Sequence, residues 1–176
     1  MAGHITFITG GARSGKSRYA QQTACALSSN PLYVATARIA DEDFEARVQR
    51  HRGDRPPEVW TSLEEDKFPS RLDLSGRTVV LDCTTLWLTN FCSDHQWQCE
   101  QAFEAWRTEA DCLLSRPFHH LLIISNELGM GLHADTEIGR KFTDVAGWAN
   151  QHLAARAHTA IMMVSGLPLY LKKTDP

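Results

Sequence analysis

The sequence predicts an α/β fold with a mostly parallel sheet and crossover helices. Short apolar runs of strand length alternate with longer amphipathic stretches along the chain, which is typical of strands joined by helices. The runs are apolar on both faces, as expected of parallel strands that helices cover on each side. The chain has 176 residues, of which 43% are hydrophobic, enough for one core and too few for two comfortable domains. We therefore expect residues 1–176 to form a single domain.

Taken in chain order, the strands are expected where these apolar runs occur. The polar, proline-interrupted stretch Arg52–Gly76 holds none of them, yet it is too rich in special residues to be a mere linker. The expected strands are His4–Thr9, Leu32–Thr36, Thr78–Asp82, Leu121–Ser125 and Ala160–Ser165, and a final short strand is expected after Pro168.

Helices are expected in the intervals between the strands. The last interval shows the pattern most clearly, because Ile138, Phe142 and Val145 recur at helical spacing. The expected helices are Gly15–Leu27, Asp41–His51, Thr84–Phe91, Trp97–Leu114 and Thr136–Ala157.

Charge and cysteine usage exclude several classes of partner. The formal net charge of −3 comes from interspersed acidic and basic residues, so we expect no nucleic-acid partner. No stretch approaches the ~18 apolar residues of a membrane span, and the start of the chain has no basic, cleavable leader. The five cysteines are odd in number and form no C-x-x-C pair, which favours a reducing compartment, the cytoplasm.

One loose group of potential metal ligands stands out in the second half of the chain. Cys92, His95 and Cys99 offer three groups at irregular spacing, with no second matching pair. We favour ordinary half-buried cysteines beside a surface histidine over a metal site.

The stretch "ITGGARSGKS" contains the phosphate-loop pattern G-x-x-x-x-G-K-S between an expected strand and an expected helix. Backbone N–H groups at such a helix start bind anions. We expect Lys16, facing solvent, to reach the β- and γ-phosphates of a nucleotide, and the Ser17 hydroxyl to bind Mg²⁺. The alternative is a tight turn with a surface lysine. The expected nucleotide-binding residues of the loop are Gly10, Gly11, Ala12, Arg13, Ser14, Gly15, Lys16 and Ser17.

Two acidic residues follow expected strands, at the edge where open parallel sheets bind ligands. Asp82 ends the run "TVVLD" and has the placement of a carboxylate that holds the magnesium ion. It is equally placed to cap the helix that begins at Thr84. Glu127 lies in the loop "SNELGMG", where it shapes either a substrate site or only a turn.

His51 ends the expected helix that Asp41 begins. It falls on the same stripe as Phe44 and Val48, so it faces inward. The cations just past the helix end would suit another phosphate. A packed histidine favoured by the helix dipole, beside a solvated charged face, is the alternative. The residues that follow His51 are Arg52, Gly53, Asp54, Arg55 and Pro56.

The segments "FITGGARSGKSRYA", "LYVATARIADEDFEARVQRHRGDRP", "WTSLEE", "VVLDCTTLWLTN", "IISNELGMG" and "FTDVAGWANQHLA" occur in this order over nearly the whole chain. Together they resemble the bifunctional adenosylcobinamide kinase / adenosylcobinamide-phosphate guanylyltransferase family of cobalamin biosynthesis. The phosphate loop is shared by many families, whereas the blocks around His51 and Glu127 are much more specific to this one. The resemblance implies a RecA-like P-loop fold and a homotrimer.

The resemblance also implies two reactions. Adenosylcobinamide is first phosphorylated with ATP or GTP, and GMP from GTP is then passed to the new phosphate through a guanylyl-histidine, which falls on His51. Mg²⁺ is expected at Ser17 and Asp82, with Lys16 as the catalytic cation. Some relatives carry a further histidine where this chain has Arg50, so no role transfers to that position. Besides the loop, the implied nucleotide-contacting residues are Thr36, Ala37, Arg38, Arg52, Gly53, Asp54, Arg55, Glu64 and Asp82.

Two other functions are compatible with the phosphate loop alone. One is a simple small-molecule kinase without a covalent intermediate, in which His51 is only structural. The other is a non-catalytic nucleotide-dependent switch, in which residues 52–76 form a conformational loop. A simple kinase does not require an inward histidine followed by paired arginines, and a switch does not require a nucleophile. We therefore favour the bifunctional enzyme.

Overall fold

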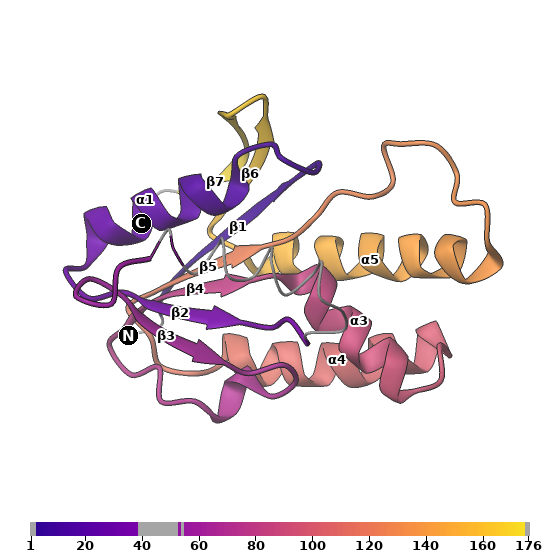
Figure 1. The fold of residues 1–176 in the computed structure, drawn as a ribbon, viewed down its shortest axis with the longest axis horizontal. Coiled ribbons are helices and arrows are strands. Elements are labelled where there is room, and N and C mark those ends of the chain that lie inside the picture. Colours follow the sequence, from indigo (N-terminus) through magenta and orange to yellow (C-terminus); the bar gives the residue numbers. More distant parts are fainter. Residues whose placement is uncertain (1–2, 39–52, 54, 175–176) are drawn as a thin grey trace.

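The computed structural model describes residues 3–38, 53 and 55–174, and a seven-stranded sheet forms its centre (Figure 1). The strand order is β3-β2-β4-β5-β1-β6-β7, parallel except for β7, which pairs antiparallel with β6. The strands are β1 His4–Gly10, β2 Leu32–Ala35, β3 Thr61–Glu64, β4 Thr78–Asp82, β5 His120–Ile124, β6 Thr159–Val164 and β7 Leu167–Lys173.

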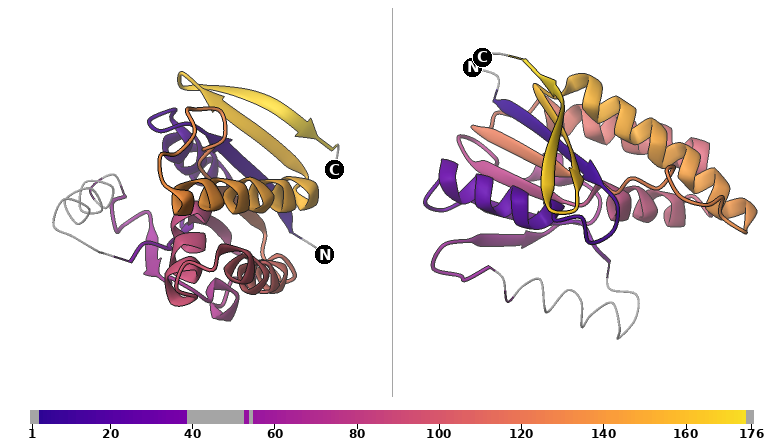
Figure 2. Two further views of the ribbon diagram at one scale, coloured as in Figure 1. Left: turned by 90° about the vertical axis from the view of Figure 1, so that its right-hand side faces the viewer. Right: turned by 90° about the horizontal axis from the view of Figure 1, so that it is seen from above.

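Helices cover both faces of the sheet (Figures 1 and 2). On one face, α1 packs Ala20 and Ala24 against a layer that includes Ile8 and Leu122. On the other face lie α3, α4 and α5, above a layer that includes Phe7. Neighbouring residues such as Phe7 and Ile8 are thus buried on opposite faces, which confirms the prediction of two-sided strands. The helices are α1 Lys16–Leu27, α3 Thr84–Asp94, α4 Cys99–Leu114 and α5 Glu137–Arg156, with a short 3₁₀ helix, η1, at Pro69–Arg71.

The sheet topology places the phosphate loop and Asp82 at the same edge. Strand β5 lies between β1, which leads into the loop, and β4, which ends in Asp82. Ile8 on β1 and Asp82 on β4 both align with Ile124 of β5, so the carboxyl ends of β1 and β4 lie at one level. This order is that of a RecA-like P-loop fold, which confirms the expected fold class.

The expected elements agree with the structure except at the sheet edges and in one helix. The prediction missed β3 because it is an exposed edge strand without an apolar run. The final strand is longer than expected and already includes Pro168, which is tolerated at a sheet edge. The expected helix Asp41–His51 lies outside the described residues. Elsewhere the boundaries shift by no more than a few residues, as where α3 continues to Asp94. None of the helices that the structure describes combines the length and apolar character that a bilayer span needs.

Candidate functional site

The phosphate loop joins β1 to α1 and depends on its two motif glycines. Gly10 has φ +144°, and a Cβ there would lie 2.5 Å from the Met163 carbonyl oxygen. Gly15 has φ +97° and caps α1 without a side chain, so the N–H groups of the first helical turn are left for an anion. The Gly166 amide donates to the Ser14 carbonyl oxygen at 3.0 Å, which fixes the loop against the β6–β7 turn.

Lys16 lies inside the loop with only 7% of its surface exposed. Its Nζ donates to the carbonyl oxygens of Gly10 at 2.8 Å and Gly11 at 2.6 Å. Burial lowers the pKa of Lys16, and the nearby Cys83 and Asp82 oppose that shift. The expectation that this lysine faces solvent is wrong, because the loop folds back over the ammonium group and satisfies it with backbone oxygens.

Asp82 is linked to the loop by its side chain. Its Oδ2 accepts hydrogen bonds from the Ser17 hydroxyl at 2.9 Å and from the Tyr33 hydroxyl at 2.6 Å. The N-cap of α3 is Cys83, not Asp82, so the helix-capping alternative for Asp82 is wrong. The two hydroxyls therefore hold this carboxylate beside the start of α1, and its Oδ1 receives none of these hydrogen bonds.

Tyr33 and Arg55 extend this cluster. The Arg55 guanidinium carbon lies 3.5 Å from the centre of the Tyr33 ring. The Trp60 ring packs edge-on against the Tyr33 ring, with the two centroids 6.0 Å apart. Burial and the neighbouring Asp82 raise the pKa of Tyr33 well above its usual value, so its hydroxyl stays protonated and donates to Asp82. Arg55 is 7% exposed, and its Nε and Nη1 have no hydrogen-bond partner among the described residues.

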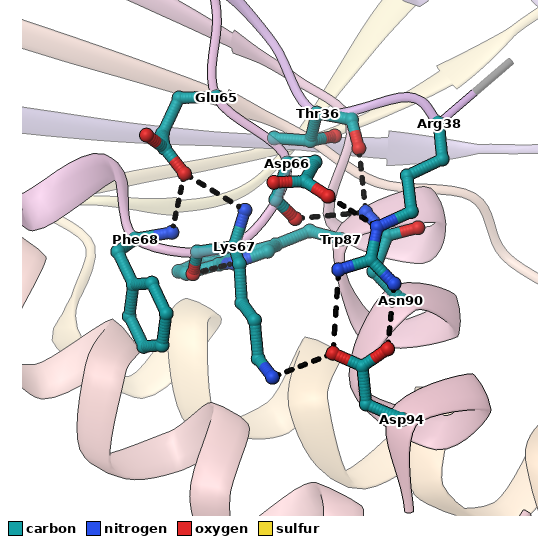
Figure 3. A network of polar contacts seen from close by, with 9 residues as sticks. All are labelled: Thr36, Arg38, Glu65, Asp66, Lys67, Phe68, Trp87, Asn90 and Asp94. Carbon is teal, nitrogen blue, oxygen red and sulfur yellow. Dashed lines mark hydrogen bonds and ion pairs between the residues drawn. The ribbon is translucent and has the colours of Figure 1, made fainter.

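The segment after β2 is held by a second polar network (Figure 3). The Asn90 amide donates to the carbonyl oxygens of Thr36 at 2.7 Å and Asp66 at 2.8 Å. Arg38 pairs with the carboxylates of Asp66 and Asp94. Lys67 reaches Asp94 as well, at 2.6 Å. Arg38 is thus engaged with two protein carboxylates.

A model of the family described as cobinamide kinase / cobinamide phosphate guanyltransferase matches residues 6–171. The chain belongs to this family. The bifunctional adenosylcobalamin biosynthesis protein CobP of Pseudomonas aeruginosa is 38% identical over 171 residues, covering 94% of this chain and 95% of that protein. The protein CobU of Escherichia coli K12, with the same descriptive name, is 35% identical over 182 residues, covering 96% and 99%. The corresponding CobU of Salmonella typhimurium is 33% identical with the same coverage.

In this member of the cobinamide kinase / guanyltransferase family, the described site residues come together at the carboxyl edge of the sheet. Gly10–Ser17, Thr36 and Asp82 are joined by direct contacts, since the Thr36 amide donates to the Asp82 carbonyl oxygen at 3.1 Å. Glu64 ends β3 at the same edge and pairs in register with Ala35. Arg50, His51, Arg52 and Asp54 lie outside the described residues.

The structure also describes the two remaining sequence candidates, Glu127 and the group of Cys92, His95 and Cys99. The Glu127 carboxylate accepts from the Gly129 amide at 2.6 Å, and the Glu127 amide donates to the Gly10 carbonyl oxygen at 3.0 Å. This loop is a turn that braces the phosphate loop. In the described part of the chain no group of His, Cys, Asp and Glu side chains is arranged to hold a metal ion. Cys92 and Cys99 are buried, and burial raises the pKa of the Cys92 thiol to about 12.

Sequence reasoning missed Tyr33, Asn90 and the carboxylates of Asp66 and Asp94. Tyr33 lies in an apolar strand, where an aromatic residue is expected for packing alone. Asn90 gives one signal, because an amide on an otherwise buried helix face needs a polar partner. The acidic partners of Arg38 come from different segments, and only the fold reveals that they meet.

Proposed function

We propose that this chain catalyses two consecutive steps of cobalamin biosynthesis at one nucleotide site, as a single domain spanning residues 1–176. It phosphorylates the aminopropanol hydroxyl of adenosylcobinamide with ATP or GTP, and it then transfers GMP from GTP to the new phosphate to give adenosylcobinamide-GDP. The observation that carries the proposal is that Lys16 binds the loop backbone and Ser17 binds Asp82 at the phosphate loop in a chain of this family.

In the kinase step, the loop holds the triphosphate and neutralises its charge. The bound phosphates take the place of the Gly10 and Gly11 carbonyl oxygens as partners of the Lys16 ammonium, and charge-assisted bonds are stronger than those it leaves. The corrinoid hydroxyl oxygen attacks the γ-phosphorus, the bond from that phosphorus to the nucleoside diphosphate breaks, and the hydroxyl proton is released to water. The N–H groups at the start of α1 then stabilise charge on the departing diphosphate.

The residues at the loop fit a magnesium ion. The Ser17 hydroxyl and the Asp82 carboxylate are hard oxygen ligands in contact with each other, and Mg²⁺ prefers such ligands together with phosphate oxygens and water. Oδ1 of Asp82 is the carboxylate oxygen that Ser17 and Tyr33 leave unused. When bound, Mg²⁺ supplies positive charge to the phosphates. Ser17 and Asp82 would hold it, and Tyr33 would keep Asp82 in place.

In the transferase step, we assign the nucleophile to His51. The ordinary pKa of histidine is about 6.5, so we expect His51 to attack the α-phosphorus of GTP as a neutral imidazole at neutral pH. A P–N bond forms, and the bond to pyrophosphate breaks. An oxygen of adenosylcobinamide phosphate then attacks the same phosphorus, which frees the histidine. Arg52 and Arg55 would bind the incoming phosphate, and two Arg55 donors that have no hydrogen-bond partner among the described residues support this role.

The test is His51→Ala, assayed with GTP labelled at the α-phosphate. We expect the parent protein to retain an acid-labile label and the variant to retain none, while the variant still phosphorylates adenosylcobinamide. His133→Ala, which removes an exposed loop histidine, is the matched control and should be labelled like the parent. A labelled His51→Ala protein would show that another residue is the nucleophile. A parent that phosphorylates the corrinoid but is never labelled would be a simple kinase.

We further propose a homotrimer in the cytoplasm. Strand β7 leaves Leu167, Leu169 and Leu171 between 54% and 71% exposed along an edge of the sheet, and such apolar edges are usually covered by another chain. All five cysteines are free, which supports a reducing compartment.

A further inference from the structure

A groove of about 1050 Å³ lies far from the phosphate loop, among η1, the second half of α4 and the last turns of α5. α4 and α5 lie side by side on one face of the sheet (Figures 1 and 2). Because α4 leads into the start of β5, the groove lies toward the amino ends of the strands. The phosphate loop follows the carboxyl end of β1, so the two sites are on opposite edges.

The groove is strongly cationic. Its lining includes Arg71, Arg107, Arg116 and Arg156, together with His152, and Asp111 is its only carboxylate. The formal charge of this lining is about +3 with His152 neutral, whereas the whole chain carries −3. Positive charge is therefore concentrated in this groove although the chain as a whole has a negative net charge.

The single carboxylate in the groove already has two partners. Oδ1 of Asp111 accepts from His152 Nε2 at 2.9 Å and from Arg156 Nε at 3.0 Å. Arg107 pairs with Glu104 on the same helix. Asp111 thus positions His152 and Arg156 of α5 against α4, and it makes no ion pair with the other arginines of the groove.

Arg71 and Arg116 have no ion pair within the part of the chain that the structure describes. Arg71 lies on the Phe68 ring, 4.1 Å from its centre, which leaves its N–H edges free to donate. Arg116 acts on Asp73 electrostatically, but the two are not within ion-pair distance. These two side chains are exposed cations held at the rim of the groove by η1 and by the end of α4.

We propose that this groove binds a small molecule bearing two or more phosphates, at a site separate from the catalytic one. Guanidinium groups match phosphate oxygens in a two-pronged geometry, and they hold less water than ammonium groups. The groove has the size of small-molecule sites. Its cations come from three elements around a hollow rather than along a stripe, which favours a compact anion over a nucleic acid or a flat membrane.

Helix dipoles give a partial alternative account of these arginines. Arg156 ends α5 and Arg116 follows α4, and cations stabilise helix C-termini. That account does not extend to Arg107, which lies within α4. It also does not explain why Arg71 of η1 faces the same hollow.

Cys112 gives a local readout that does not depend on catalysis. Its exposed thiol lines the groove, while the other exposed thiol, Cys25, lies on α1 across the sheet. We would measure the maleimide labelling rate of each thiol by peptide mass spectrometry, with tripolyphosphate titrated in at 0.15 M salt. We expect Cys112 labelling to slow at least fivefold at saturation and Cys25 labelling to stay unchanged.

The double variant Arg71→Gln/Arg116→Gln should need at least tenfold more tripolyphosphate for the same protection. Lys141→Gln removes an exposed cation of α5 outside the groove and should behave like the parent. Equal protection by sulfate at matched ionic strength would overturn the proposal, and so would unchanged protection in the double variant. If the double variant does not fold, the comparison of tripolyphosphate with sulfate in the parent decides.

Two further outcomes would also overturn the proposal. If single-stranded RNA or vesicles of anionic lipid protect Cys112 at lower charge concentration than tripolyphosphate, the groove serves a macromolecule. If Cys112 is not labelled in the native protein at all, a second copy of the chain covers the groove. Neither outcome bears on the proposed reactions, because their site lies at the opposite edge of the sheet.

Discussion

Lys16 is a buried cation whose partners in this structure are backbone oxygens of its own loop. The aliphatic part of its side chain packs within the loop, and in the proposed function only the ammonium group binds the phosphates. Removing the charge while keeping the volume therefore separates its chemical role from its structural one.

We predict that Lys16→Met lowers kcat/KM of both the kinase and the transferase reactions by at least 100-fold. Losing one preorganised charged donor typically costs about 10²–10³ in rate. Steady-state kinetics with each substrate would measure the loss, and circular dichroism would show a retained fold. Lys141→Met changes an exposed lysine that pairs with Glu137 on its own helix, and it should leave both rates unchanged. Parent-like rates in Lys16→Met would contradict the phosphate-loop assignment.

Tyr33 is one of the residues that only the structure reveals at this site, and its hydroxyl and its ring make different contacts. The hydroxyl donates to Asp82 at 2.6 Å, while the ring supports the Arg55 guanidinium. Tyr33→Phe removes the first interaction and keeps the second.

We predict that Tyr33→Phe lowers the free energy of unfolding by about 1.5–3 kcal/mol, the range for a hydrogen bond to a charged group. Urea unfolding would measure the change. Thr61→Val is the control, since it removes a hydroxyl hydrogen bond to Asn30 that is exposed to water; its stability should change little. Equal effects in the two variants would mean that Tyr33 does not hold Asp82.

At the scale of elements, three histidines meet at the starts of β1, β5 and β6, the edge opposite the phosphate loop. The rings of His4 and His120 have centroids 4.6 Å apart, and those of His4 and His158 lie 4.9 Å apart. Burial and the neighbouring His4, His119 and His158 lower the pKa of His120 to about 4. The folded state thus keeps this imidazole neutral, with Nε2 at 2.8 Å from the Thr6 hydroxyl.

This cluster predicts a loss of stability in acid. The unfolded chain takes up a proton on His120 near pH 6.5, whereas the folded chain does so only near pH 4. The free energy of unfolding should therefore fall as the pH drops from 6.5 toward 4, by about 1–2 kcal/mol for this partly exposed group. In His120→Gln the difference in urea stability between pH 7 and pH 5 should shrink by that amount. It should persist in His133→Gln, which removes an exposed histidine.

Elements whose physics is local were predictable from the sequence, and those defined by pairing were not. The phosphate loop is signalled by Gly10, Gly15 and Lys16 because backbone conformation and charge are needed at fixed spacing. β3 gives no such signal, since its exposed residues belong to a strand only through pairing with β2. The contacts of Tyr33 with Asp82 and Arg55 likewise join distant segments, and periodicity carries no information about them.

At the scale of the whole molecule, the sheet ends in an unprotected edge. β7 pairs only with β6 in the described structure, and its exposed side chains include Leu169, Tyr170 and Leu171. A long apolar edge strand is a surface for pairing with another chain. The proposed trimer would cover it, and the arginine groove would stay open if the interface is confined to this edge.

We predict that Leu169→Glu/Leu171→Glu converts the trimer into monomers, because each buried interface would then have to desolvate carboxylates on an apolar strand. Light scattering at micromolar concentrations would measure the mass of the parent and of the variant. Leu132→Glu is the control: Leu132 is 99% exposed on a loop, so the same substitution there adds charge to solvent and should leave the trimer intact. A monomeric parent would contradict the trimer itself. A double variant that stays trimeric would place the interface on another surface of the molecule, and Cys112 labelling in the parent would then show whether that surface includes the arginine groove.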